Sequence, residues 1–265
     1  MYNFEYQKPR SVADAAKAIG GAEDGKLLAG GMTLIPTLKQ RLAKPSDLID
    51  LGAIPDLKGI KKDGNAIVVG AMTKHVEVAT SDVVKGAIPA LAQLAEMIGD
   101  PQVRNRGTLG GSIANNDPAA DYPAAVLGLN ATVITNKRKI AADEFFKGMF
   151  DTALEPDEII TGVSFPIPEK AGYEKFRNPA SRYAVVGVFV AKTGGNIRVA
   201  VTGAGPVVFR QKDMEAALSK SFAPDAVASV KQSANGLNSD IHASAEYRAH
   251  LVTVMAKRAV QRAAG

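Results

Sequence analysis

The sequence predicts an α+β protein made of two parts. From residue 11 to residue 165, short strand-like segments alternate with helical segments, whereas after residue 168 three strand-like segments are followed by three helical ones. Between them, Pro166-Ile167-Pro168 interrupts both patterns as a linker would. A chain of 265 residues, 46% of them hydrophobic, is long enough to bury two cores. We therefore expect one domain over residues 1–168 and a second over residues 169–265.

The first part opens with a capped helix. Ser11 stands three residues before Asp14, a spacing typical of a helix start, and the alanine-rich segment that follows predicts a helix over residues 12–19. A short strand over residues 26–29 comes next. The segment over residues 33–42 has helical character, with a proline near its first turn.

Two further patterns predict strands. Residues 47–51 alternate polar and apolar side chains, as a half-buried strand does. Residues 60–62 and 66–70 flank Asp63-Gly64, a dipeptide typical of tight hairpin turns. We expect these two segments to pair with each other.

A helix over residues 90–98 follows Pro89 and ends before Gly99. Beyond it, residues 103–121 contain too much glycine and asparagine for an ordinary helix or strand, so we expect irregular backbone there. The first part then closes with a helix over residues 122–129 and strands over residues 131–135 and 159–165.

The second part predicts a single layer of strands covered by helices. The expected strands are residues 173–176, 184–191 and 197–202, and the expected helices are residues 211–219, 225–237 and 245–263. Three strands followed by three helices favour an α+β layer with the helices on one face of the sheet.

The residue composition excludes several kinds of metal site. The chain has no cysteine, so it can hold neither a disulfide, nor a zinc–thiolate site, nor a thiolate-bound iron–sulfur cluster. Its three histidines, His75, His242 and His250, form no pair with metal-binding spacing, and none is close in sequence to a glycine-rich loop. We expect no metal ion on this chain.

Charge and hydropathy argue against nucleic acid and membranes. The net charge of +5 comes from scattered lysines and arginines without interleaved aromatic residues, which better suits an anionic cofactor or an acidic partner than nucleic acid. The longest apolar run, residues 184–191, is too short to cross a bilayer, and the first ten residues lack the pattern of a signal peptide. We expect a soluble, cytoplasmic protein.

Two glycine-rich loops carry the chemistry. The first spans residues 28–33 around Gly30-Gly31, between the predicted strand and helix, and the second spans residues 106–115 around Gly110-Gly111. Paired glycines let main-chain N–H groups point at an anion, although either loop alone could be a simple turn. Together with the hydroxyls of Thr33, Thr108 and Ser112, two such loops could enclose a pyrophosphate.

Neither loop has the spacing of a nicotinamide-binding Rossmann motif or a P-loop, and no serine-hydrolase motif is present.

Two acids follow the second loop. Asp117 precedes Pro118, so a helix N-cap is the favoured role. Asp121 could equally be a cap or a ligand for a sugar hydroxyl or a ring N–H.

The two loops and the segment Asp117-Pro118-Ala119-Ala120-Asp121 resemble the flavin subunit of the molybdenum hydroxylases, the medium subunit of carbon monoxide and xanthine dehydrogenases. The resemblance extends over almost the whole chain. It implies a vanillyl-alcohol-oxidase-type FAD-binding region followed by a domain of three antiparallel strands and three helices. One departure is that Met32-Thr33 stands where relatives commonly carry His or Gln followed by Ser, so a side-chain contact can be lost there.

The resemblance also implies a cofactor site. In it, both loops face the FAD pyrophosphate and Asp121 contacts FAD. Ile98, Gly99 and Ile160 line the flavin or adenine, and Lys175 and Tyr183 lie near the isoalloxazine. The predicted cofactor-binding residues are Leu28, Ala29, Gly30, Gly31, Met32, Thr33, Leu34, Ile98, Gly99, Gly107, Thr108, Gly110, Gly111, Ser112, Ala114, Asn115, Asp121, Ile160, Lys175 and Tyr183.

The function implied is electron relay with no catalytic acid or base on this chain. Electrons would pass from a molybdopterin-binding large subunit through two [2Fe–2S] clusters of a small subunit to FAD, which this chain would hold non-covalently. The three subunits would form a dimer of heterotrimers. The residues leave two alternatives open. One is a stand-alone flavin oxidase or dehydrogenase acting on a small organic substrate, and the other is a module that only binds a nucleotide cofactor.

Overall fold

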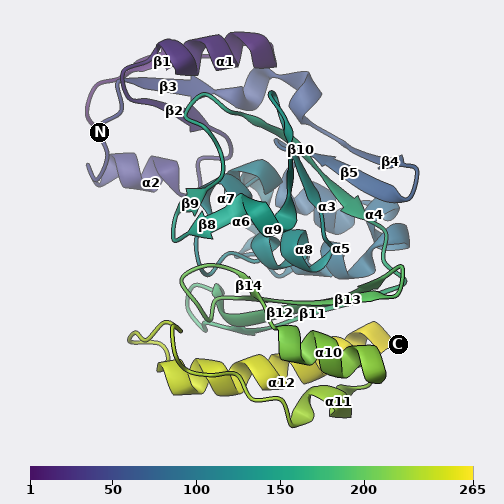
Figure 1. Cartoon of the computed structure of the whole chain (residues 1–265). Helices are drawn as coiled ribbons and strands as arrows, with labels where there is room; N and C mark the ends of the chain where they lie inside the picture. Colours follow the sequence, from purple (N-terminus) through teal and green to yellow (C-terminus); the bar gives the residue numbers. More distant parts are fainter. Residues whose placement is uncertain (265) are drawn as a thin grey trace.

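The computed structural model describes residues 1–264 as three stacked layers of sheet and helix (Figure 1). A small sheet holds the N-terminal segment, a larger sheet with several helices forms the middle, and a third sheet covered by helices forms the C-terminal part. No helix in this described range is both long and apolar enough to cross a bilayer.

The first sheet is parallel, with β3 (Asp47–Asp50) between β1 (Glu5–Gln7) and β2 (Gly25–Leu28). Helix α1 (Val12–Gly21) begins as predicted, because the Ser11 hydroxyl accepts a hydrogen bond of 3.1 Å from the Asp14 amide. The strand β1 was not predicted. The helix after the first glycine loop, α2 (Leu34–Lys39), is shorter than expected.

The second sheet has five strands in the order β4-β5-β10-β6-β7, and all neighbouring pairs are antiparallel. The predicted hairpin around Asp63-Gly64 is confirmed. The strands are β4 (Ile60–Asp63), β5 (Ala66–Gly70), β6 (Thr132–Thr135), β7 (Lys139–Ala141) and β10 (Ile160–Pro166), and a separate hairpin is formed by β8 (Phe146–Gly148) and β9 (Asp151–Thr152).

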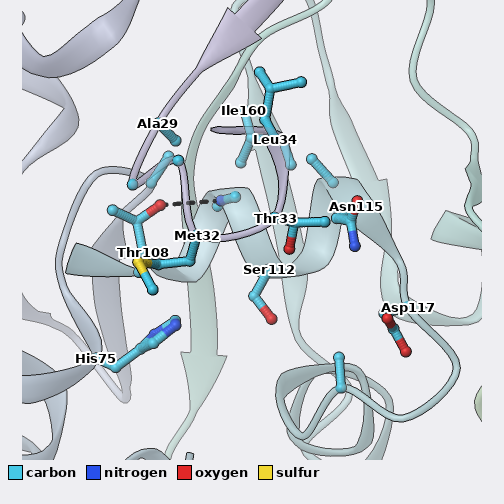
Figure 2. A pocket seen from close by; sticks show the side chains of 18 of the residues that line it. Ala29, Met32, Thr33, Leu34, His75, Thr108, Ser112, Asn115, Asp117 and Ile160 are labelled. Carbon is cyan, nitrogen blue, oxygen red and sulfur yellow. Dashed lines mark hydrogen bonds between the residues drawn. The ribbon is translucent and has the colours of Figure 1, made fainter. Parts of the chain in front are cut away.

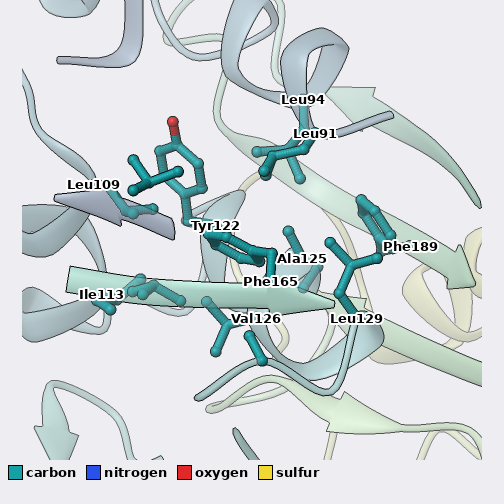
Figure 3. Close-up of a cluster of buried hydrophobic side chains, with 14 of the residues drawn as sticks. Leu91, Leu94, Leu109, Ile113, Tyr122, Ala125, Val126, Leu129, Phe165 and Phe189 are labelled. Carbon is teal, nitrogen blue, oxygen red and sulfur yellow. The ribbon is translucent and has the colours of Figure 1, made fainter. Parts of the chain in front are cut away.

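The helices of this part pack together into its core. Figure 3 shows Tyr122 and Val126 of one of them near Phe165 of β10, all fully buried. The helices are α3 (His75–Thr80), α4 (Asp82–Ala87), α5 (Pro89–Glu96), α6 (Pro101–Arg106), α7 (Leu109–Asn115), α8 (Tyr122–Gly128) and α9 (Ala142–Phe145), with two short 3₁₀ turns, η1 (Leu51–Ala53) and η2 (Pro55–Leu57).

The expectation of irregular backbone over residues 103–121 is wrong, because α6 and α7 occupy most of that range. Both helices have side-chain N-caps: Asp100 accepts from the Val103 amide at 2.9 Å, and Thr108 accepts from the Gly111 amide at 3.2 Å. These caps stabilise helix starts by about 1 kcal/mol each, enough to offset the cost of one glycine in a helix.

The C-terminal sheet has four antiparallel strands, β11 (Lys170–Arg177), β12 (Ala184–Thr193), β13 (Asn196–Thr202) and β14 (Phe209–Arg210). The short fourth strand was not predicted. Two of the three predicted helices form over most of their length, as α10 (Lys212–Lys220) and α12 (Ala245–Ala264). The third, α11 (Pro224–Ala228), ends well before residue 237. The polar segment that follows it is not helical, and Gly236 there has a φ of +76°.

The central strand β12 is covered on both faces. Its residues Val186, Val188 and Val190 pack with the C-terminal helices, whereas Phe189 belongs to the core of the first part, where Figure 3 shows it near Leu129. Helices α10, α11 and α12 therefore cover one face, and α5 and α8 lie against the other. A run of consecutive apolar residues is typical of a strand buried in this way.

Candidate functional site

A cavity of about 430 Å³ lies between the two glycine-rich loops (Figure 2). It is lined by every predicted cofactor-binding residue except Leu28 and Lys175. Leu28 instead packs beneath its own loop, since a Cβ added to Gly31 would lie 3.2 Å from Leu28 Cδ1. Cavities of this size with a few polar groups are typical small-molecule sites.

The loops touch each other through their main chains. A Cβ added to Gly30 would overlap the carbonyl oxygen of Arg106 and lie 2.8 Å from Gly107 Cα. A Cβ at Gly111 would lie 3.3 Å from Ala29 Cβ. Two stretches remote in sequence therefore meet, as the sequence predicts, and glycine is what permits the approach.

The first loop presents a row of main-chain amides without partners. Within residues 1–264, the N–H groups of residues 29 to 34 donate no hydrogen bond to another protein group. Gly31, with a φ of +75°, turns the chain so that the loop curves around the cavity. Residues 29 to 34 are half-buried or exposed, so these amides are open to water or a ligand, and a row of free amides beside a cavity favours an anion.

The second loop differs from the first in this respect. Most of its amides already donate within the protein: Leu109 to Thr73 O at 3.1 Å, Gly110 to Ala71 O at 2.8 Å and Gly111 to the Thr108 hydroxyl at 3.2 Å. The expectation that amides of both loops are free is thus wrong for this one. Its contribution comes from side chains and from the close approach at its glycines.

Several polar side chains point into the cavity. Figure 2 shows Thr33, Ser112 and Asn115 around the same space, and none of these side chains hydrogen bonds to another residue in the described part of the chain. Thr108 is different because its hydroxyl caps α7. The three free groups can serve a ligand that accepts and donates hydrogen bonds.

The two acids after the second loop have separate roles. Asp117 caps no helix, contrary to the favoured expectation: its Oδ1 accepts from the Ala119 amide at 2.8 Å and so closes a turn, because residues 117–120 do not continue into a helix. Asp121 precedes α8 but does not cap it with its side chain. Both acids line the cavity, Asp121 with its carboxylate buried.

Lys175 lies behind Asp121 and does not reach the cavity. Its ammonium is 2.9 Å from Asp121 Oδ1, and its side chain is only 2% exposed. The alternation of side chains along β11 turns Lys175 toward α8, and the carboxylate stands between it and the cavity.

His75 is a cavity residue that the sequence analysis missed. Its amide donates to the Gly107 carbonyl at 3.0 Å, and Figure 2 shows its ring beneath Thr108 and Met32. Burial, and to a lesser extent the nearby charge of Arg104, lowers the pKa of His75 to about 4, so the ring is neutral at physiological pH. Only the fold brings α3 against the second loop, so no local pattern could have revealed this neighbour.

Glu158 lines the cavity and is held in place by a network of hydrogen bonds. Its fully buried side chain accepts hydrogen bonds from Thr135 at 2.7 Å, from Arg138 at 2.9 and 3.0 Å, and from the Glu155 amide at 3.0 Å. The bonds from Arg138, then those from Thr135 and Glu155, lower the pKa of Glu158 to about 2 although burial opposes them.

Replacing Glu158 with Gln is expected to destabilise the fold by about 2 kcal/mol at pH 7, because a charged acceptor of several hydrogen bonds is lost. A carboxyl whose folded pKa is lower than its unfolded pKa stabilises the fold above the unfolded value of about 4.3, and this stabilisation declines as the pH falls toward 2. Urea unfolding at pH 7 and pH 3 measures the effect. If the free energies of unfolding of the wild type and E158Q differ as much at pH 3 as at pH 7, the assigned role of the Glu158 charge is wrong.

No cluster of three or more His, Cys, Asp or Glu side chains suited to a metal ion occurs among residues 1–264. The cavity is lined by the free amides of the first loop, the Thr33 and Ser112 hydroxyls and the Asn115 carboxamide, together with the side chains of His75, Asp117 and Asp121. Such donors fit a phosphate-containing organic ligand.

Two family models cover the chain. The model described as the FAD binding domain in molybdopterin dehydrogenase matches residues 2–168, and the model for the CO dehydrogenase flavoprotein C-terminal domain matches residues 171–263. The first alone covers more than half of the chain.

Proteins of known function and structure agree with these matches. The chain is 36% identical to the carbon monoxide dehydrogenase medium chain of Hydrogenophaga pseudoflava (98% of this chain, 96% of the relative) and 38% identical to the nicotine 6-hydroxylase medium subunit of Paenarthrobacter nicotinovorans (97% and 96%).

Among solved structures, carbon monoxide dehydrogenase from Hydrogenophaga pseudoflava superposes with a TM-score of 0.87 at 36% identity, covering 98% of this chain and 97% of that one. Quinoline 2-oxidoreductase from Pseudomonas putida superposes with a TM-score of 0.90 at 29% identity, covering 99% and 97%. The chain therefore belongs to the family of FAD-binding medium subunits of the molybdenum hydroxylases, which are oxidoreductase complexes of several subunits.

Proposed function

We propose that this chain holds one FAD non-covalently and relays electrons through it to an external acceptor. The electrons would come from [2Fe–2S] clusters on a small partner subunit, which receives them from a molybdopterin-binding large subunit that oxidises the substrate. The observation that carries the proposal is the row of unpartnered amides over residues 29 to 34, facing a cavity between two loops in main-chain contact.

The residues present fit FAD. The amides of residues 29 to 34 would hold the diphosphate bridge, helped by the hydroxyls of Thr33 and Ser112, and no side chain at residue 32 is needed for that. Tyr183 would lie near the isoalloxazine, and Asp121 would contact FAD. Ile98, Gly99 and Ile160 would line the flavin or the adenine. Bound FAD supplies the electron-accepting chemistry, and the protein binds and orients it.

The metals of such a complex belong to other subunits, because a chain without cysteine cannot ligate an iron–sulfur cluster through thiolates. We assign no general acid or base to this chain. The two matched families meet near residue 170, where the second sheet has ended at Pro166 and β11 begins, and this supports domains over residues 1–168 and 169–265.

We further propose that the first domain is of the vanillyl-alcohol-oxidase type. The likeness to carbon monoxide dehydrogenase supports the same subunit arrangement, which we take to be a dimer of heterotrimers in the cytoplasm. Size-exclusion chromatography with light scattering and cell fractionation test these two points.

Purification of the native assembly tests the proposal as a whole. We expect this chain to copurify with a large and a small subunit, with one FAD per copy of the chain and molybdenum and iron in the other subunits. A chain that purifies alone, carries FAD and oxidises an alcohol would support a stand-alone oxidase instead. A colourless assembly in which this chain binds no FAD would contradict the proposal.

A further inference from the structure

Two donors from the C-terminal sheet converge on Asp121. Tyr173 and Lys175 are two residues apart on β11, so both side chains lie on the same face of the strand. The Tyr173 hydroxyl donates to Asp121 Oδ1 at 2.5 Å, and the Lys175 ammonium lies 2.9 Å from Oδ1 and 3.1 Å from Oδ2. We call these three residues the carboxylate clamp.

The clamp is buried and asymmetric. Tyr173 is fully buried, and the side chains of Asp121 and Lys175 are 5% and 2% exposed. Of the three, only Asp121 lines the cavity. The donors therefore approach the carboxylate from the protein side and leave its other side toward the cavity.

A buried carboxylate needs such donors. Burial raises the pKa of Asp121, and the charge and hydrogen bond of Lys175 together with the hydrogen bond of Tyr173 oppose that rise. Removing either donor leaves part of the negative charge uncompensated in a medium of low dielectric. The negative charge of Asp121 at the cavity wall is thus set by Tyr173 and Lys175, which contact Asp121 but do not line the cavity.

We infer that Tyr173 is a positioning residue for the flavin: its hydroxyl fixes and partly neutralises the Asp121 carboxylate at the cavity wall. The inference rests on the proposed function, because it concerns the field that FAD would experience there. A less neutralised carboxylate disfavours the negative charge that reduction brings to a flavin, so removing the hydroxyl lowers the midpoint potential.

The chain provides a matched control in Tyr122. This residue is also a fully buried tyrosine, it is adjacent to Asp121 in sequence, and its hydroxyl has no hydrogen-bond partner among residues 1–264. Tyr122→Phe deletes the same atom from a similar environment without touching the clamp. Its effect on flavin potential should therefore be small.

The test compares Y173F and Y122F in the assembled complex by spectroelectrochemical titration at pH 8, with FAD content and melting temperature measured alongside. We expect Y173F to retain FAD. At a fixed potential, its ratio of oxidised to reduced flavin should be about tenfold higher than in the wild type, which corresponds to a midpoint potential about 30 mV lower for a two-electron couple. Y122F should match the wild type.

Equal potentials in Y173F, Y122F and the wild type, or equal shifts in both variants, would overturn the inference while FAD binding stands. A wild-type complex without FAD would instead remove the proposed function. If Y173F does not assemble, Lys175→Gln removes the other donor. It should lower the potential in the same direction, and an unchanged potential there overturns the inference as well.

Discussion

Replacing Gly30 with Ala is expected to weaken FAD binding about 100-fold while leaving the chain folded. The added Cβ would overlap the Arg106 carbonyl oxygen and lie 2.8 Å from the carbonyl carbon. Because both partners are main-chain atoms, the loops must move apart, at a cost of about 3 kcal/mol. That corresponds to a roughly 100-fold rise in Kd for FAD, measurable by flavin fluorescence on refilling the apoprotein.

Gly86→Ala is the matched control. Gly86 lies in α4, and a Cβ there meets no atom within 4 Å. G86A should bind FAD as the wild type does and should melt at the same or a slightly higher temperature. A Kd for FAD in G30A equal to that of G86A would refute the assignment of the loop contact to the cofactor site.

The second large effect is expected from Gly172→Ala, on stability alone. A Cβ at Gly172 of β11 would overlap the Ala259 carbonyl oxygen of α12 and lie 2.9 Å from the Ala263 amide nitrogen. The strand and helix must separate, and overpacking of this kind destabilises by about 3 kcal/mol. For a chain of this size, that lowers the melting temperature by roughly 6 to 12 °C.

Gly148→Ala provides the comparison for a strand glycine with room. Its nearest neighbour, Asp151 Cβ, would be 3.7 Å from the new methyl group, which is an ordinary contact. Differential scanning calorimetry of both variants gives the result. A melting temperature for G172A within 2 °C of that for G148A would mean that α12 does not pack on β11 as closely as described.

Much of the fold follows from local signals. Ser11 and Asp14 fix the start of α1, Asp63-Gly64 fixes the β4–β5 hairpin, and the apolar run of β12 marks a strand covered on both faces. Local signals failed where tertiary contacts outweigh propensity. Helix α7 forms despite its glycines because Gly110 packs directly against Ala71, a close approach that the sequence does not display.

The site divides in the same way. The glycine pairs are visible in the sequence, and their meeting is confirmed, because close backbone approach needs glycine and little else. The roles of His75 and Lys175 were not visible. Each depends on which segment packs behind which, as α3 does behind the second loop and β11 behind Asp121.

The strand β12 has a consequence for how the molecule behaves as a body. Since its Phe189 side belongs to the core of the first part and its valine side to the C-terminal helices, neither part can swing away without exposing apolar surface to water. The two parts therefore move as one body, and the linker near residue 168 does not act as a hinge. Heating should melt the whole chain in one cooperative step, and a fragment cut at that linker should aggregate.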